Sequence, residues 1–516
     1  MASTGGGGGV ALRAPVDASA GVGSGVGGVG VGSINALYGY NDAVRGDEDD
    51  DDLKTANGDE DAPDDGGGDD DDDDDGASAD DTEALLSEGG RAPPTCWART
   101  KRVLRTYMGV LGPGSMVAVG YMDPGNWATD INAGANFAYD LLMVVLFSSS
   151  VAVFMQTLAL RLGIASGHDL AQQCARRFSK PVVWVLFVLA QIAIIATDMA
   201  EVIGSAIALK LLFGLPLEWG VLASAASVFF VLLGTSKHMN LLEYGILALV
   251  LTIFGCFIYL VAASDVNYAE LFLGYLPKGV LATNVEALYV AIGIIGATVM
   301  PHNLYLHSGM VREHVAGKKK AKAIRYSTYD VGVSLFFAFV VNSAILTVAA
   351  ANFFNYLPEG HAPSIEDAYD LLLDKLGYAV ATVFAVSLLL AGQSSTITGT
   401  LAGQFVAEGF INWRLAPWLR GLITRLMAIA PAFAVAFFVE GDAAVDQLLV
   451  LSQVILSFQL PFAIFPLVYF TTDTELMGRF ANGRVAAVVG YAIATLLAGL
   501  NVYLLVEVIL GAINGE

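Results

Sequence analysis

Two apolar segments of the sequence are each interrupted by a proline beside polar or sulfur-containing residues. The interruption at 123–126 reads Asp-Pro-Gly-Asn, and the one at 297–302 reads Ala-Thr-Val-Met-Pro-His. Proline removes a helical hydrogen bond and clashes with the preceding turn, while glycine loosens the chain further. We therefore predict two broken helices, interrupted at 123–126 and 300–302, with backbone carbonyl groups freed at each break.

These interruptions supply a set of metal ligands. Asp123 offers a carboxylate, Asn126 an amide oxygen, and Ala297 a backbone carbonyl one turn before the second break. Such oxygens suit a hard divalent cation, whereas the thioether of Met300 favours softer transition metals over Mg²⁺ and Ca²⁺. A methionine in an apolar helix usually serves packing alone, but its place beside Pro301 favours a ligand role. The set points to Mn²⁺ or Fe²⁺ and is compatible with Co²⁺, Zn²⁺ and Cd²⁺.

The Asp123 carboxylate argues for function rather than structure. A proline by itself most often marks a kink in a helix. A charged carboxylate within a membrane, however, costs roughly 2.5–3.5 kcal/mol on insertion scales and is functional by default. A carboxylate, an amide and a second matching break together favour a substrate site over a kink.

Other polar residues in apolar segments could carry protons or support the site. Asp198 and Glu201 are three residues apart, which places both on one face of a helix. Buried acids serve as proton relays, although this pair could also form a structural network with a loop arginine. His302 follows the second break and has an unperturbed pKa of about 6.5, although a buried histidine can also be a packed core residue. Gln156 is a candidate for a position behind the metal ligands.

Charge divides the chain into an acidic tail and an apolar body. Residues 1–95 carry 24 acidic and four basic side chains, and residues 96–516 carry 26 and 23. The tail cannot bury a core, so we predict a disordered cytosolic segment over 1–95. The body is under 12% charged, whereas soluble domains are about 25% charged. This excludes an ordinary soluble enzyme, and the lack of basic surface excludes nucleic-acid binding.

The body, 96–516, is predicted to be an all-α polytopic membrane domain. Its apolar runs lack the alternation of a membrane barrel and are long enough to cross a core of roughly 30 Å, which takes about 20 helical residues. We place eleven helices near 106–134, 141–163, 181–212, 219–235, 241–262, 286–312, 328–352, 376–400, 419–439, 447–471 and 485–511.

Basic residues orient these spans. With a cytosolic amino terminus, 20 Lys and Arg residues flank the inner ends, and only Lys210, Lys278 and Lys375 lie outside. Positive charge accumulates on the cytosolic side, so the amino terminus is predicted to be cytosolic and the carboxyl terminus external.

The positions of the two breaks predict an internal repeat. They fall in the first and sixth spans, so spans one to five correspond to spans six to ten. An odd number of spans inverts the second copy. Inverted repeats with broken helices are typical of secondary transporters, whose substrate lies at the midplane between the breaks.

The sequence resembles the Nramp (natural resistance-associated macrophage protein) family of divalent-metal transporters, and within it the bacterial-type manganese branch. The resemblance runs from about residue 104 to the end and rests on the two interrupted motifs together with 392–400 and 451–462. It implies a LeuT-like fold with two inverted five-helix repeats plus an eleventh helix. It also implies proton-coupled import of Mn²⁺ or Fe²⁺ into the cytosol by alternating access.

By the same resemblance, the metal ligands are Asp123, Asn126, the Ala297 carbonyl and Met300, with support from Gln453. The resemblance also favours Asp198 and Glu201 as proton carriers. An incoming divalent cation disfavours a proton near Asp123, and that proton could pass to His302 or to the acid pair. No cofactor is expected, because the metal ion is the substrate and the proton is the coupling ion.

Other functions fit the sequence less well. An amino-acid carrier of similar fold would place a substrate carboxylate against Asp123, which repels it. Family branches that carry Mg²⁺ or Al³⁺ replace the methionine that stands here at Met300. A receptor or signalling scaffold with an Nramp-like membrane domain needs a soluble output domain, and the sequence ends a few residues after the last span. No nucleophile–base pair or histidine cluster indicates a membrane enzyme.

The sequence leaves several points open. Asp81, Leu85 and Leu86 match an acidic dileucine sorting signal, so sorting adaptors are candidate partners beside the bilayer and metal ions. A cytosolic amino terminus is compatible with the plasma membrane and with a vacuolar or endosomal membrane. The preference between Mn²⁺ and Fe²⁺, the stoichiometry, the oligomeric state and the role of the tail are not determined.

Overall fold

The computed structural model describes residues 113–235, 239–315, 319–354, 364–412, 417–438 and 442–514. The predicted acidic tail and the sorting pattern at Asp81, Leu85 and Leu86 lie outside these residues, as does the start of the first predicted span.

Helices make up the fold, and the described residues contain no β-strand. In chain order they are α4 (Pro113–Gly120), α5 (Pro124–Phe137), α6 (Leu142–Ser166), α7 (Leu170–Arg177), α8 (Lys180–Phe213), α9 (Leu217–Thr235), α10 (Met239–Ala263), α11 (Tyr268–Gly274), α12 (Val280–Thr283), α13 (Val285–Val299), α14 (Pro301–His314), α15 (Lys320–Asn352), α16 (Ile365–Leu376), α17 (Tyr378–Ile411), α18 (Pro417–Phe438), α19 (Asp442–Thr472), α20 (Thr474–Met477), the 3₁₀ turn η1 (Gly478–Phe480) and α21 (Arg484–Asn514).

The predicted spans all fall on helices in the described part of the chain. Seven segments are long and apolar enough to cross a membrane, with α13 and α14 together forming one of them. The four other predicted spans correspond to the pair α4 and α5, to α9, to α10 and to α18. The structure interrupts the first helix at 121–123, between α4 and α5, and the second at Met300, between α13 and α14. Residues 124–126 and 301–302, which the sequence analysis placed within the breaks, instead begin α5 and α14, because proline fits the first turn of a helix.

Two helices extend well beyond the predicted spans. α15 begins at Lys320 rather than near 328, and α17 continues to Ile411 rather than ending near 400. The prediction followed apolar residues, which mark only the part of a helix that crosses lipid. Backbone hydrogen bonds continue the helix past that part, so these two boundaries were wrong.

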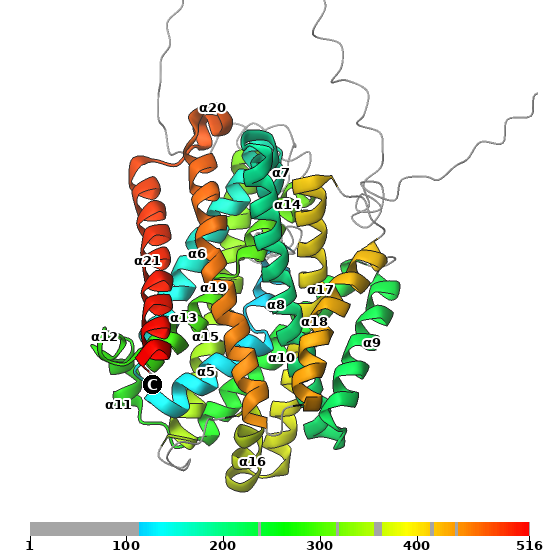
Figure 1. Ribbon diagram of the computed structural model, residues 1–516, viewed down its shortest axis with the longest axis vertical. Coiled ribbons are helices and arrows are strands. Elements are labelled where there is room, and N and C mark those ends of the chain that lie inside the picture. The colour runs from blue at the N-terminus through cyan, green and yellow to red at the C-terminus, as the bar shows by residue number, and fades with distance from the viewer. Residues whose placement is uncertain are drawn as a thin grey trace, which may run out of the picture.

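The long helices run side by side, with the short elements at opposite ends of the bundle (Figure 1). α7 and α20 lie at the upper end, while α11, α12 and α16 lie at the lower end. The upper elements carry Arg176, Arg177 and, on η1, Arg479, whereas α16 ends with Lys375. The upper end is therefore the one that the basic residues predict to be cytosolic.

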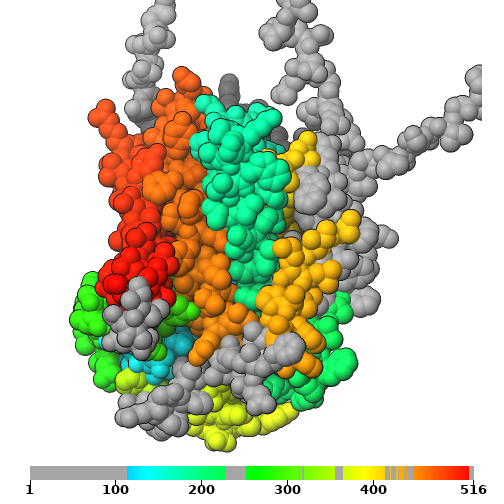
Figure 2. Space-filling view, in the orientation of Figure 1, coloured from blue at the N-terminus to red at the C-terminus, as the bar shows by residue number. Residues whose placement is uncertain are grey.

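Close packing around the breaks fixes the positions of their helices. Trp127 of α5 is fully buried, and its ring lies 4.9 Å from Phe257 of α10 and 5.1 Å from Phe384 of α17. Gly296 of α13 faces the backbone of α19, since a Cβ there would lie 2.0 Å from the Gln453 carbonyl oxygen. α19 and α8 lie next to each other on the face seen in Figure 2.

Polar contacts tie both ends of the bundle. At the end that carries α7, Ser308 Oγ of α14 accepts a hydrogen bond from Leu170 N of α7 at 3.0 Å. Arg312 Nη1, also on α14, donates to Gln172 Oε1 of α7 at 2.9 Å. At the opposite end, Lys210 of α8 pairs with Glu366 of α16 at 2.6 Å. The first two contacts hold α14 against α7, and the third joins α8 to α16.

Candidate metal centre

The first break is capped by its own carboxylate. Asp123 is the N-cap of α5, and Asp123 Oδ1 accepts a hydrogen bond from Asn126 N at 2.8 Å. Pro124 follows at the first position of α5, where its missing N–H costs no helical hydrogen bond. The Asp123 side chain is 0% exposed, so a carboxyl group lies deep inside the domain.

The second break consists of a single residue. Met300 separates α13 from α14 and has a φ of +39°, which L-residues with a long side chain rarely adopt. Pro301 begins α14 and has no N–H to donate to the carbonyl four residues earlier, which is that of Ala297. The sequence thus frees the very carbonyl that we predict as a ligand.

One side chain joins the two breaks. Asn126 Nδ2 donates to Asp123 Oδ1 at 2.7 Å and to the Ala297 carbonyl oxygen at 3.1 Å. The fold therefore brings together three of the predicted ligands from segments 171 residues apart. An amide hydrogen with partial positive charge lies between two oxygens that could also bind a cation.

Acceptor oxygens outnumber donors at this place. Among the described residues, Asp123 Oδ2 and Gln453 Oε1 are buried and accept no hydrogen bond. Gln453 of α19 lies against the first break, since a Cβ on Gly125 would be 2.0 Å from Gln453 Nε2. Buried polar atoms are normally satisfied, so oxygens without donors beside a freed carbonyl and a buried Met300 fit a cation.

Two buried polar residues escaped the sequence analysis. Asn342 of α15 donates to Asn126 Oδ1 at 3.2 Å and to the Tyr121 carbonyl at 3.0 Å. Asp130 is buried on α5, seven residues after Asp123. That spacing, two helical turns, was a signal available in the sequence. The contact of Asn342 depends on helix packing and had no local signal.

Gln156 lies behind the first break rather than among the ligands. Its Nε2 donates to the Tyr121 hydroxyl at 2.8 Å, and its Oε1 lies 2.9 Å from His307 Nδ1. α6 is thereby linked to the first break and to α14. This contact pattern is compatible with the supporting role predicted for Gln156.

His302 faces α8. Its Nδ1 lies 3.4 Å from Thr197 Oγ1, and that hydroxyl donates its one hydrogen to the Ala193 carbonyl at 3.0 Å. In this arrangement the Thr197 oxygen can accept a hydrogen bond from the His302 tautomer that carries its hydrogen on Nδ1.

The predicted acid pair is buried between α8 and α17. Ser395 of α17 donates to Glu201 Oε1 at 2.8 Å. A Cβ on Gly399 would lie 3.2 Å from Glu201 Oε1 and 3.4 Å from Asp198 Oδ1. Both carboxylates thus reach the same glycine. One turn after Glu201, Gly204 lies against Pro124 of the first break.

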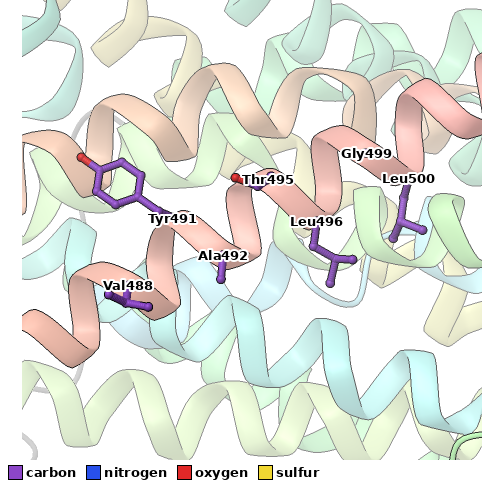
Figure 3. Close-up of a pocket in the computed structure, with 7 residues that line it drawn as sticks. All are labelled: Val488, Tyr491, Ala492, Thr495, Leu496, Gly499 and Leu500. Atoms are coloured by element: carbon purple, nitrogen blue, oxygen red, sulfur yellow. The ribbon is translucent and has the colours of Figure 1, made fainter.

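A groove on α21 is separate from this centre. Val488, Tyr491, Ala492, Thr495, Leu496, Gly499 and Leu500 line it, and all of them come from this one helix (Figure 3). Its volume is about 720 Å³. The lining is mostly apolar, as expected for a helix surface that faces lipid.

Comparison with known families identifies the chain. The family described as "Natural resistance-associated macrophage protein-like" (Nramp) matches residues 114–507. The chain belongs to the Nramp family. It is therefore a multi-pass membrane transporter rather than an enzyme, as predicted.

Curated Nramp relatives cover most of the chain. It is 48% identical over 411 residues to the divalent metal cation transporter MntH of Listeria welshimeri. The aligned region covers 79% of this chain and 91% of that relative. The MntH of Agrobacterium fabrum is also 48% identical and spans 78% of this chain and 88% of its own length.

Solved structures confirm the predicted fold class. A mutant of the Eremococcus coleocola manganese transporter matches with a TM-score of 0.71 and 35% identity, over 82% of this chain and 90% of that one. MhsT in complex with L-phenylalanine matches at 0.54 with 15% identity, over 76% of this chain and 97% of that one. This second likeness concerns the fold alone.

Proposed function

We propose that this Nramp protein is a proton-coupled symporter that imports Mn²⁺, Fe²⁺ or both into the cytosol by alternating access. The observation that carries this proposal is the junction of the two breaks, where Asn126 links Asp123 to the Ala297 carbonyl at 2.7 and 3.1 Å. The 48% identity to divalent metal cation transporters supports the same substrate class.

The metal site draws on both breaks. Asp123 supplies the charged oxygen, and Ala297 and Gln453 supply neutral oxygens. A half-turn of the Asn126 amide exchanges its Nδ2 for Oδ1 and adds another oxygen. Met300 supplies the sulfur that favours transition metals over Mg²⁺ and Ca²⁺.

We place the proton route on groups that contact α8 or lie on it. A divalent cation beside Asp123 disfavours any proton held there. We place His302 first on the route, because it lies next to the second break and against Thr197 of α8. Asp198 and Glu201 lie on α8 itself and carry the proton onward to the cytosol.

The distribution of basic residues predicts how the protein is oriented in the membrane. With a cytosolic amino terminus, the proposed direction of transport is into the cytosol. The membrane is the plasma membrane or a vacuolar or endosomal one. The sorting pattern at Asp81, Leu85 and Leu86 remains a hypothesis on adaptor binding.

Reconstitution tests the proposal. Purified protein in liposomes should take up Mn²⁺, and an inward proton gradient should stimulate uptake that excess Mg²⁺ does not inhibit. Absence of uptake by folded, correctly oriented protein would favour the scaffold reading. Uptake that Mg²⁺ inhibits would favour a magnesium carrier.

A further inference from the structure

Asn303 contacts the sulfur at the second break. It lies in the first turn of α14 and is fully buried. Its Nδ2 donates to Met300 Sδ at 3.2 Å, and its backbone N donates to the Met300 carbonyl at 3.2 Å. The residue that separates the two half-helices is therefore held through both its backbone and its side chain.

The end of α4 keeps the Asn303 amide against this sulfur. A Cβ on Gly120, the last residue of α4, would lie 2.7 Å from Asn303 Nδ2 and 3.5 Å from Met300 Sδ. No real side chain would tolerate the first of these distances. The glycine thus leaves the space in which the amide reaches the thioether, and it connects the first break to the second.

We propose that Asn303 is a positioning residue that sets metal selectivity by orienting the Met300 thioether, an inference that rests on the proposed function. A methionine side chain has three rotatable bonds and adapts to its surroundings. Fixing the sulfur before the metal arrives removes an ordering cost from binding. One sulfur lone pair accepts the amide N–H, and the other stays available to a transition metal.

The Asn303 side chain is poorly placed for stability alone. Among the described residues, its Oδ1 is buried and accepts no hydrogen bond. A buried polar atom without a partner costs folding free energy. Because its oxygen is unsatisfied and its N–H meets only a weak acceptor, folding stability alone does not account for an asparagine here, whereas the contact with the sulfur does.

A double-mutant cycle tests this role. Asn303→Ala, Met300→Ala and the double variant are reconstituted, and the Ca²⁺ concentration that halves Mn²⁺ uptake is measured for each. Asn303→Ala should lower discrimination against Ca²⁺ by about threefold to tenfold, and the double variant should match Met300→Ala, because coupled residues are not additive. Effects that multiply in the double variant would overturn the proposal.

Two further variants separate positioning from folding. Gly120→Ala displaces the Asn303 amide while keeping every ligand, so it should lower discrimination in the same direction, and unchanged discrimination would overturn the proposal even if Asn303→Ala fails to fold. Asn501 is a matched control, because it is buried on α21 and donates to the Ser457 carbonyl at 2.8 Å. Asn501→Ala should leave the Ca²⁺ competition unchanged.

The unmodified protein distinguishes the two levels of inference. If it takes up no Mn²⁺ in these liposomes, the proposed function fails. If it takes up Mn²⁺ with selectivity against Ca²⁺ and the Asn303 and Met300 effects multiply, only the positioning role fails.

Discussion

The two breaks and the acid pair of α8 both place carboxylates deep in the domain, but they hold them differently. At the first break, Asp123 caps a helix and accepts hydrogen bonds from a backbone N–H and an amide. On α8, Glu201 lies in the middle of an unbroken helix and accepts from the hydroxyl of Ser395 on a neighbouring helix.

This difference suits each region to a different ion. Backbone donors fix Asp123 in one geometry, which favours coordination of a metal. A serine hydroxyl can donate or accept, so Glu201 can gain a proton without losing its partner. The two regions touch where Gly204 of α8 meets Pro124 and where Thr197 meets His302. In the proposed mechanism, metal binding and proton movement would therefore use separate regions that contact each other.

Removing the charge at the first break should have the largest effect. Asn at position 123 can still cap α5, but it removes the one carboxylate among the proposed ligands. Loss of one charged partner in a buried site costs about 3 kcal/mol or more, roughly a hundredfold in binding. Asp123→Asn should therefore keep its melting temperature and lose Mn²⁺ uptake in liposomes. Near-normal uptake would remove Asp123 from the site.

Removing the sulfur should change selectivity rather than abolish transport. With Met300→Ala, Ca²⁺ and Mg²⁺ should compete with Mn²⁺ about tenfold better, the scale of one specific contact in a pocket. Met300→Gly is the control for backbone strain, because glycine adopts a positive φ without cost. Both variants should lose selectivity equally. Selectivity that survives in either one would contradict a role for the thioether.

Neutralising the acid pair should act on protons and spare the metal. Glu201→Gln keeps an oxygen for Ser395 but cannot ionise, so the pH dependence of uptake should flatten. Mn²⁺ affinity, measured by calorimetry, should stay within about threefold because no metal ligand is altered. Wild-type pH behaviour would return Asp198 and Glu201 to a structural role.

Crowding the acid pair should have the smallest effect. A methyl group at Gly399 would lie 3.2 Å from Glu201 Oε1 and would crowd the carboxylate. Gly399→Ala should lower proton-stimulated uptake by about twofold to threefold, equivalent to under 1 kcal/mol. Gly403→Ala, one turn further along α17, is the matched control, because a Cβ there would lie 3.9 Å from its nearest neighbouring atoms. Equal effects of the two changes would argue against the acid pair.

The breaks could be predicted from sequence because proline acts locally. Proline alone does not end a helix here, since Pro431 lies inside α18 and both Pro461 and Pro466 lie inside α19. The breaks at Pro124 and Pro301 were predicted because glycine or polar residues stand beside these two prolines, and the missing N–H of Pro301 identifies Ala297 as the freed carbonyl. The ligands Asp123, Asn126 and Met300 follow from their places beside these prolines.

Contacts between helices could not be predicted in the same way. Ser395 meets Glu201 across 194 residues, and no spacing within either helix indicates this pairing. Asn303 follows the second motif directly, yet its contact with Met300 depends on room left by Gly120 of α4. Gln453 came only from family resemblance, because a glutamine in an apolar helix has no local sign of its partner.

The bridging amide of Asn126 has a consequence for the unloaded half of the transport cycle. In the proposed cycle, the carrier returns to its outward-facing state after it has released the metal, with the buried Asp123 carboxylate and Ala297 carbonyl no longer bound to an ion. The Asn126 N–H group reaches both oxygens at once and places partial positive charge where the departing ion had been. In the proposed cycle, the Asn126 side chain can thus bind the metal during import and donate hydrogen bonds to the empty site during the return step. Satisfying these two oxygens would lower the free-energy barrier to that return.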